Sequence, residues 1–123
     1  MDSEVYKRMA LRTNTVPDLF KEHGKDVVNL LHGAMGASTE ANELLDAVKR
    51  CLFYGKEIDR VNVIEEVGDL LWYTSIILEA IDASFDEAMQ RNIDKLRTRY
   101  PDGFNADQAI NRNIEAERKA LEP

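Results

Sequence analysis

Apolar residues recur at helical intervals along nearly the whole chain. The longest such run, residues 25–54, places apolar side chains every three or four positions, as on one face of an α-helix. The members of this stripe are Leu30, Ala34, Ala37, Ala41, Leu44, Val48 and Leu52. Gly33 and Gly36 lie inside the run and weaken a helix by roughly 1 kcal/mol each relative to alanine. We predict one long helix, or two helices joined at a bend, ending at Gly55.

Capping and turn residues predict the other elements, and all of them are helical. Before the long run we expect a helix over residues 3–11 and a loop around 14–18 that contains Pro17. After it we expect a helix that is capped by Asp59 or Asn62 and runs to about Ile81, and then a helix that follows a Ser84–Glu87 capping box and runs to about Arg99. A turn over 100–103 and a polar helix over about 106–121 complete the chain. No strand, internal repeat or low-complexity linker is expected. The predicted fold class is therefore all-α, a bundle of four to six helices.

The helix that follows Asp59 is apolar on two sides. One stripe consists of Val63, Val67, Leu70, Thr74, Ile77 and Ile81. Trp72 and Ile76 fall roughly opposite that stripe on a helical wheel. A helix with two apolar faces must bury both, and in so short a chain a second subunit can cover one of them. We therefore expect a tight homo-oligomer, either a homodimer or a homotetramer.

Composition narrows the class of protein. The chain has 123 residues, of which 44% are hydrophobic and 32% charged, as expected for one domain over residues 1–123. The net charge of −7 argues against binding to a nucleic-acid polymer or a membrane surface. A single cysteine, Cys51, excludes an internal disulfide. Since no stretch has the length and apolar character of a membrane span, and Met1–Glu4 does not resemble a signal peptide, we expect a cytoplasmic location.

Two pairs of acids at helical spacing carry the chemistry. Glu40 and Glu43 form one pair and Glu66 and Asp69 the other, and members of each pair project from the same helix face. Four acids that converge from two helices would repel each other, by about 4 kcal/mol per contact at ~4 Å in an effective dielectric of about 20. A cation relieves this repulsion, and oxygen-only ligands suit Mg²⁺ or Mn²⁺. We predict a metal site at these four residues.

The sequence contains E-x-x-E and, after about 20 intervening residues, E-x-x-D. This pattern resembles that of the MazG-like all-α nucleoside triphosphate pyrophosphohydrolases. Neighbouring sequence blocks are also similar and occur in the same order over roughly residues 25–104. These blocks are His32–Gly36 leading into Glu40–Leu44, Glu65–Tyr73, Asn92–Leu96, Arg99–Pro101 and Gly103–Phe104. Asn42 departs from the pattern, because many members have glycine between the two glutamates.

The resemblance implies a fold, a reaction and a set of residues. Members cleave a nucleoside triphosphate to the monophosphate and pyrophosphate, with Mg²⁺ as cofactor, in nucleotide-pool house-cleaning or regulation. The four acids match the family's metal ligands. The residues that match its substrate-binding positions are Tyr73, Asn92, Lys95, Arg99 and Tyr100.

Several roles stay open at the sequence level. Glu43 is our choice for the acid that takes a proton from the attacking water. His32 shares the acid face and either contacts the base or sugar, or is a core or interface histidine. Lys95 and Arg99 either bind phosphates or simply end a helix, where cations are favoured. Phosphoribosyl-ATP pyrophosphohydrolase is an alternative enzyme, and a non-catalytic helical oligomer that binds a nucleotide or a partner is an alternative of another class.

Overall fold

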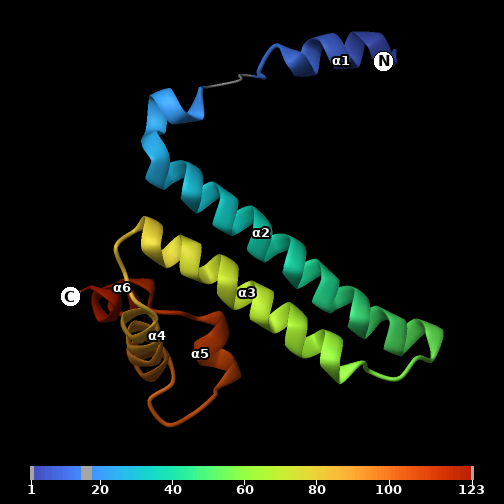
Figure 1. Ribbon diagram of the computed structural model, residues 1–123. Helices are drawn as coiled ribbons and strands as arrows, with labels where there is room; N and C mark the ends of the chain where they lie inside the picture. The colour runs from blue at the N-terminus through green and yellow to red at the C-terminus, as the bar shows by residue number, and fades with distance from the viewer. Residues whose placement is uncertain (1, 15–17, 123) are drawn as a thin grey trace.

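The computed structural model describes residues 2–14 and 18–122, and within them it contains six helices and no strand (Figure 1). The helices are α1 (Ser3–Leu11), α2 (Leu19–Tyr54), α3 (Arg60–Ala80), α4 (Phe85–Arg99), α5 (Ala106–Ile110) and α6 (Ile114–Leu121). The predicted all-α class is confirmed. None of the described helices is long and apolar enough to cross a membrane.

Local capping explains where most helices begin and end. The Asp59 carboxylate accepts hydrogen bonds from the N–H groups of Val61 and Asn62, at 3.0 and 3.2 Å, so Asp59 is the N-cap of α3. The Ser84 hydroxyl likewise accepts from the N–H of Glu87 at 3.1 Å at the start of α4. α2 ends at Gly55, whose φ of 62° lies in the left-handed region that favours glycine.

The start of α2 differs in detail from the prediction. A break at Gly24, with φ 76° and ψ 178°, separates a short first segment from the long helix that continues from Lys25. The helix predicted over residues 25–54 is continuous, so the bend that the sequence allowed within it is absent, and the break at Gly24 lies just before its predicted start. Most of the predicted loop around Pro17 lies outside the described residues.

The predicted single helix over residues 106–121 is wrong, since the structure has two helices there. α5 ends after Ile110, and Asn113 starts α6 by accepting a hydrogen bond from the N–H of Ala116 at 3.0 Å. Asn111 uses its amide to donate to the Asp107 carboxylate at 2.7 Å. Asparagine side chains compete with the helical backbone for hydrogen bonds, so asparagine is favoured at the ends of helices rather than inside them.

α2 and α3 form an antiparallel hairpin that is the largest packed unit of the chain (Figure 1). Gly33 and Gly36 are buried at the contact. A Cβ at Gly33 would lie 2.6 Å from Cγ1 of Ile77, and a Cβ at Gly36 would overlap the ring of Tyr73. At these two positions of α2, the two helices therefore approach too closely for any larger side chain.

The contact face of α2 is not centred on the apolar stripe read from the sequence. Small and polar positions beside Glu40 pack against α3, while the outer part of the stripe remains uncovered, with Val48 39% and Leu52 71% exposed. Gly33 and Gly36, on the same face of α2 as Glu40, thus allow the hairpin to form. The outer part of the apolar stripe is therefore exposed in the single chain.

The C-terminal helices form a second packed unit, in which α4 contacts α6 (Figure 1). Arg91 of α4 donates to the carbonyl of Leu121 at the end of α6, at 2.6 Å. α1 projects away from both units (Figure 1). The protein is therefore a helical hairpin with a smaller helical unit beside the end of α3.

We expect the Gly36→Ala variant to destabilise the hairpin by about 1–3 kcal/mol, the usual range for an overpacked site. The new methyl group would meet the Tyr73 ring. Gly68→Ala is the matched control, because nothing lies within 4 Å of a Cβ at Gly68 and alanine favours a helix by about 0.5–1 kcal/mol. Urea denaturation in the presence of a chelator measures both, and equal responses would contradict the close contact.

Candidate functional site

Three acids from the two hairpin helices meet at one place. Glu40 comes from α2, and Glu66 and Asp69 come from α3. One carboxylate oxygen of each lies within 4.8 Å of those of the others. Glu66 is only 5% exposed, Glu40 is half-buried and Asp69 is exposed. This acidic trio therefore has a buried side at Glu66 and an open side at Asp69.

The close helix contact sets the register of the trio. Gly36 lies against the ring of Tyr73, and because the helices are antiparallel, one turn forward along α2 leads to Glu40 while one turn back along α3 leads to Asp69. Glu66 lies one turn further back along α3 and completes the cluster. The same contact that fixes the hairpin therefore also brings the acids together.

Electrostatics at the trio favour either a proton or a cation. Burial raises the pKa of Glu40, and the charges of Asp69, Glu43 and Glu66 together with a hydrogen bond to Glu66 raise it further. A divalent cation removes the need for that proton, since it offsets the repulsion directly. Carboxylate oxygens are the donors that Mg²⁺ and Mn²⁺ prefer, so the trio fits such an ion.

Glu66 also has a polar partner that we did not predict. The side-chain amide of Asn62 donates to Oε1 of Glu66 at 2.6 Å, across one turn of α3. The sequence suggested Asn62 only as a possible cap. The signal that could have identified it is its spacing of four residues before Glu66, which places both side chains on one helix face.

Glu43 lies outside the trio but close to it, since its charge contributes to the raised pKa of Glu40. It is exposed and lines a cavity of about 910 Å³ between the second half of α2, the α2–α3 loop and the start of α3. Glu66 lines the same cavity. The cavity also contains two basic residues, Arg50 and Lys56, of which Arg50 pairs with Asp46 at 2.6 Å. A large polar cavity therefore adjoins the trio.

Tyr73 packs inside the hairpin, and His32 lies at its edge. The two rings meet edge to face with centroids 5.8 Å apart, and Trp72 meets Tyr73 in the same way at 4.9 Å. His32 and Trp72 also line an open hollow of about 420 Å³. Tyr73 is half-buried, whereas His32 is exposed. Of the two, Tyr73 has a clear packing role over Gly36.

The candidate substrate block on α4 lies apart from the acids. Asn92 and Lys95 line a separate hollow of about 280 Å³ together with Leu78 and Leu121. α4 packs mainly against α6 rather than against α2. The described part of a single chain therefore does not bring these two residues to the trio.

Arg99 has a buried carboxylate as its partner. Its guanidinium donates to both oxygens of Glu117, at 3.0 and 2.6 Å, and Arg112 donates to the same oxygens at 3.2 and 2.6 Å. Glu117 is only 3% exposed. Tyr100 lies beside this arrangement, with its ring centroid 5.6 Å from the Arg99 guanidinium carbon. Arg99, Arg112 and Glu117 form a clamp that fixes α6 to the end of α4.

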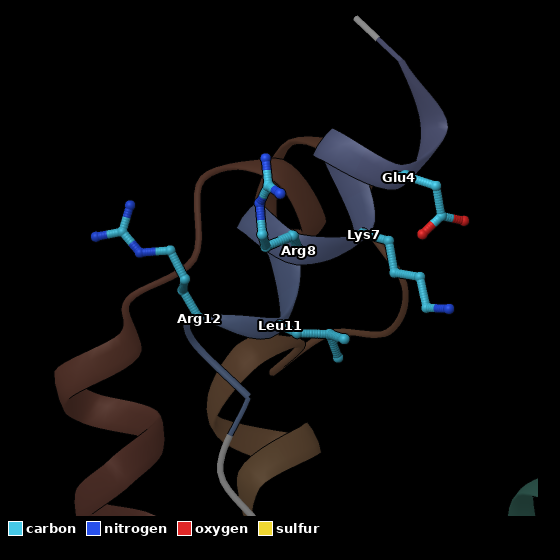
Figure 2. A pocket seen from close by; sticks show the side chains of 5 residues that line it. All are labelled: Glu4, Lys7, Arg8, Leu11 and Arg12. Carbon is cyan, nitrogen blue, oxygen red and sulfur yellow. The ribbon is translucent and has the colours of Figure 1, made fainter.

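A hollow with three basic residues lies on α1 and is not part of the acidic site. Figure 2 shows a hollow of about 390 Å³ lined by Glu4, Lys7, Arg8, Leu11 and Arg12. All five residues belong to α1 or its C-cap, and Lys7 and Arg12 point to opposite sides (Figure 2). The hollow is therefore the surface of one helix, not a pocket between elements.

Comparison with known proteins agrees with this geometry. The family model described as MazG nucleotide pyrophosphohydrolase domain matches residues 34–104, more than half of the chain and including all three acids of the trio. The gene 37 protein of Mycobacterium phage L5 is 28% identical over 90 residues, which cover 70% of this chain and 79% of the phage protein. No solved structure gives a significant match.

We expect the clamp to resist acid. The hydrogen bonds from Arg112 and Arg99 lower the pKa of Glu117 to about 2. Because the pKa of this carboxyl is lower in the folded protein than in the unfolded chain, the charged carboxylate stabilises the folded state. This stabilisation is complete at pH values above the pKa in the unfolded chain, and it is lost as the pH falls to the pKa in the folded protein. Anchoring of α6 should thus be complete at neutral pH and weaken between about pH 4.5 and 2. Carboxyl ¹³C NMR of Glu117, with hydrogen exchange of α6, measures this.

A matched pair of variants separates the clamp from general acid effects. Glu117→Gln should expose the amides of α6 to exchange at neutral pH, because the two guanidiniums lose their anionic partner. Glu115→Gln, on the same helix with its side chain 83% exposed, should leave exchange unchanged. Equal protection of α6 in both variants would contradict the anchoring role of Glu117.

Proposed function

Because the chain belongs to the MazG nucleotide pyrophosphohydrolase family, we propose that it hydrolyses a ribo- or deoxyribonucleoside triphosphate to the monophosphate and pyrophosphate. The observation that carries the proposal is the meeting of Glu40, Glu66 and Asp69 from two helices. These residues would hold Mg²⁺, or Mn²⁺ in its place. When bound, the ion offsets the phosphate charge and makes a coordinated water more acidic. Control or cleansing of the nucleotide pool is the role that fits this reaction.

Glu43 would contribute directly to bond cleavage. As an exposed carboxylate outside the trio and beside the cavity, it is available to accept a proton from the attacking water. The water oxygen would form a bond to the α-phosphorus while the bond from that phosphorus to the α–β bridging oxygen breaks. The bridging oxygen leaves with pyrophosphate. Such a displacement depends on positioning and charge, and needs no covalent enzyme intermediate.

The cavity beside Glu43 has room for a substrate. Its volume of about 910 Å³ lies within the range of roughly 300–1,000 Å³ that is usual for ligand sites. Lys56 places a positive charge on its wall, at the α2–α3 loop. A triphosphate could therefore extend from the trio along this cavity.

We also propose that the protein works as a homo-oligomer. Apolar side chains are exposed along both hairpin helices, including Leu45 at 63%, Leu52 at 71%, Phe53 at 76%, Val61 at 77% and Ile64 at 70%. Large exposed apolar surfaces are rare on soluble monomers and commonly mark sites where another protein binds. A second copy would cover it, and the α4 of a neighbouring copy could bring Asn92 and Lys95 towards a trio that lacks them within one chain. A homodimer or a homotetramer satisfies this requirement.

The products of the reaction test the proposed activity. A panel of nucleoside triphosphates with Mg²⁺ should give pyrophosphate, and ¹⁸O from labelled water should enter the monophosphate only. Orthophosphate as first product would contradict the proposal, whereas activity confined to phosphoribosyl-ATP would identify the alternative enzyme.

Substitution of the trio tests the same chemistry. Loss of a hydrogen bond that supports a metal ligand lowers metal affinity or activity by roughly 10–100-fold. Asp69→Asn and Glu66→Gln change the ligands themselves, so each should lower turnover by more than this. The control is Glu79→Gln, on the same helix but outside both the trio and its cavity. If both trio variants keep the activity of the Glu79→Gln control, the trio does not carry the reaction. If none of the triphosphates is cleaved, a non-catalytic binding oligomer becomes the better description.

The mass of the protein in solution tests the proposed assembly. Light scattering should return a mass that is an even multiple of 14.0 kDa. Leu45→Glu should reduce that mass, because a charge cannot be buried in an apolar interface without a partner. Lys21→Glu, at an exposed polar position of the same helix, should not change it. A monomer of 14.0 kDa at micromolar concentration would contradict the proposal.

A further inference from the structure

Among the described residues, Asn62 is the one neutral side chain that donates a hydrogen bond to a carboxylate of the trio, and its amide nitrogen lies 2.6 Å from Oε1 of Glu66. Asn62 is half-buried and Glu66 is 5% exposed, so water competes little for this bond. The bond is short for an amide donor, as expected where the acceptor is charged. Glu66 is therefore restrained on one of its two oxygens.

The start of α3 holds Asn62 itself in place. Asp59 accepts from the backbone N–H of Asn62 at 3.2 Å and from that of Val61 at 3.0 Å. The cap thus satisfies the main chain of Asn62 and leaves its side chain to reach one turn along the helix. The resulting connection runs from the N-cap, through the Asn62 amide, to a buried acid of the trio.

The chemical character of Asn62 matches this position. An amide N–H stabilises a carboxylate without adding charge, so the trio keeps its full attraction for a cation. A lysine or arginine at the same place would compete with the metal as a counter-charge, and an aspartate would add to the repulsion. An apolar residue would leave a buried carboxylate oxygen without its donor.

We propose that Asn62 is a positioning residue that orients Glu66 for binding of a divalent cation. The inference rests on the proposed function only in that the trio must bind such a cation. Asn62 does not need to contact the metal or the nucleotide. Hydrogen bonds of this kind to metal ligands commonly set affinity by fixing the ligand's orientation.

The test measures binding of Mn²⁺ alone, by electron paramagnetic resonance of the free ion and by calorimetry, on the full chain without nucleotide. In the Asn62→Leu variant the side chain has a similar shape and leucine is a better helix former than asparagine, but the hydrogen-bond donor is absent. We expect it to weaken Mn²⁺ binding by roughly 10–100-fold. Asn62→Gln, which keeps an amide donor, should recover much of the affinity.

Asn42→Leu is the matched control. Asn42 lines the same cavity, but its amide donates to the carbonyl of Ser38 at 2.8 Å and not to an acid of the trio. It should leave Mn²⁺ affinity unchanged. Thermal unfolding without metal is measured for each variant, because a merely structural Asn62 would lower this stability without changing the affinity of the folded protein.

The outcomes separate this inference from the proposed function. Equal Mn²⁺ affinity in Asn62→Leu and the unsubstituted protein would overturn the role of Asn62, even if nucleotide hydrolysis is found. Weakened binding in Asn62→Leu with no hydrolysis of any triphosphate would support Asn62 and overturn the proposed reaction. Failure of the unsubstituted protein to bind Mn²⁺ would overturn both.

Discussion

The contact between Gly36 and the ring of Tyr73 is the constraint on which the rest of the structure depends. Only a residue without a Cβ allows α2 and α3 to approach so closely at this point. The contact fixes how far one helix is shifted along the other, and that shift decides which side chains face each other. Glu40 meets Asp69 because both lie one turn from the contact. Packing and charge are thus joined in one short stretch of the hairpin.

Much of the helical framework could be predicted from local signals. Asp59, Ser84 and Gly55 mark helix ends through interactions within a few residues, and these ends agree with the structure. The break between α5 and α6 could not be read from periodicity, because it depends on how Asn111 and Asn113 use their side chains. Local chemistry was therefore a reliable guide except where two residues could serve either as helix interior or as helix end.

The site was predictable in part for the same reason. The spacing of the acids on each helix indicated which ones share a face, and three of the four meet. The pairing of Arg99 with Glu117 joins residues 18 positions apart, and nothing in local sequence indicates that partner. Which face of α2 contacts α3 was equally hidden, since small residues allowed a closer approach than the larger apolar stripe. Roles that depend on distant partners or on a second copy can be identified only from the three-dimensional arrangement of the residues.

The division into a hairpin and a C-terminal unit has a consequence for motion. α6 is held to α4 by the clamp and by the bond from Arg91 to Leu121, so the two helices should open and close as one cooperative unit. The hairpin has its own packing and does not rely on that unit for its register. Residues 81–84 join the two units along the chain. All three acids of the trio belong to the hairpin, so opening of the C-terminal unit would leave their mutual geometry unchanged.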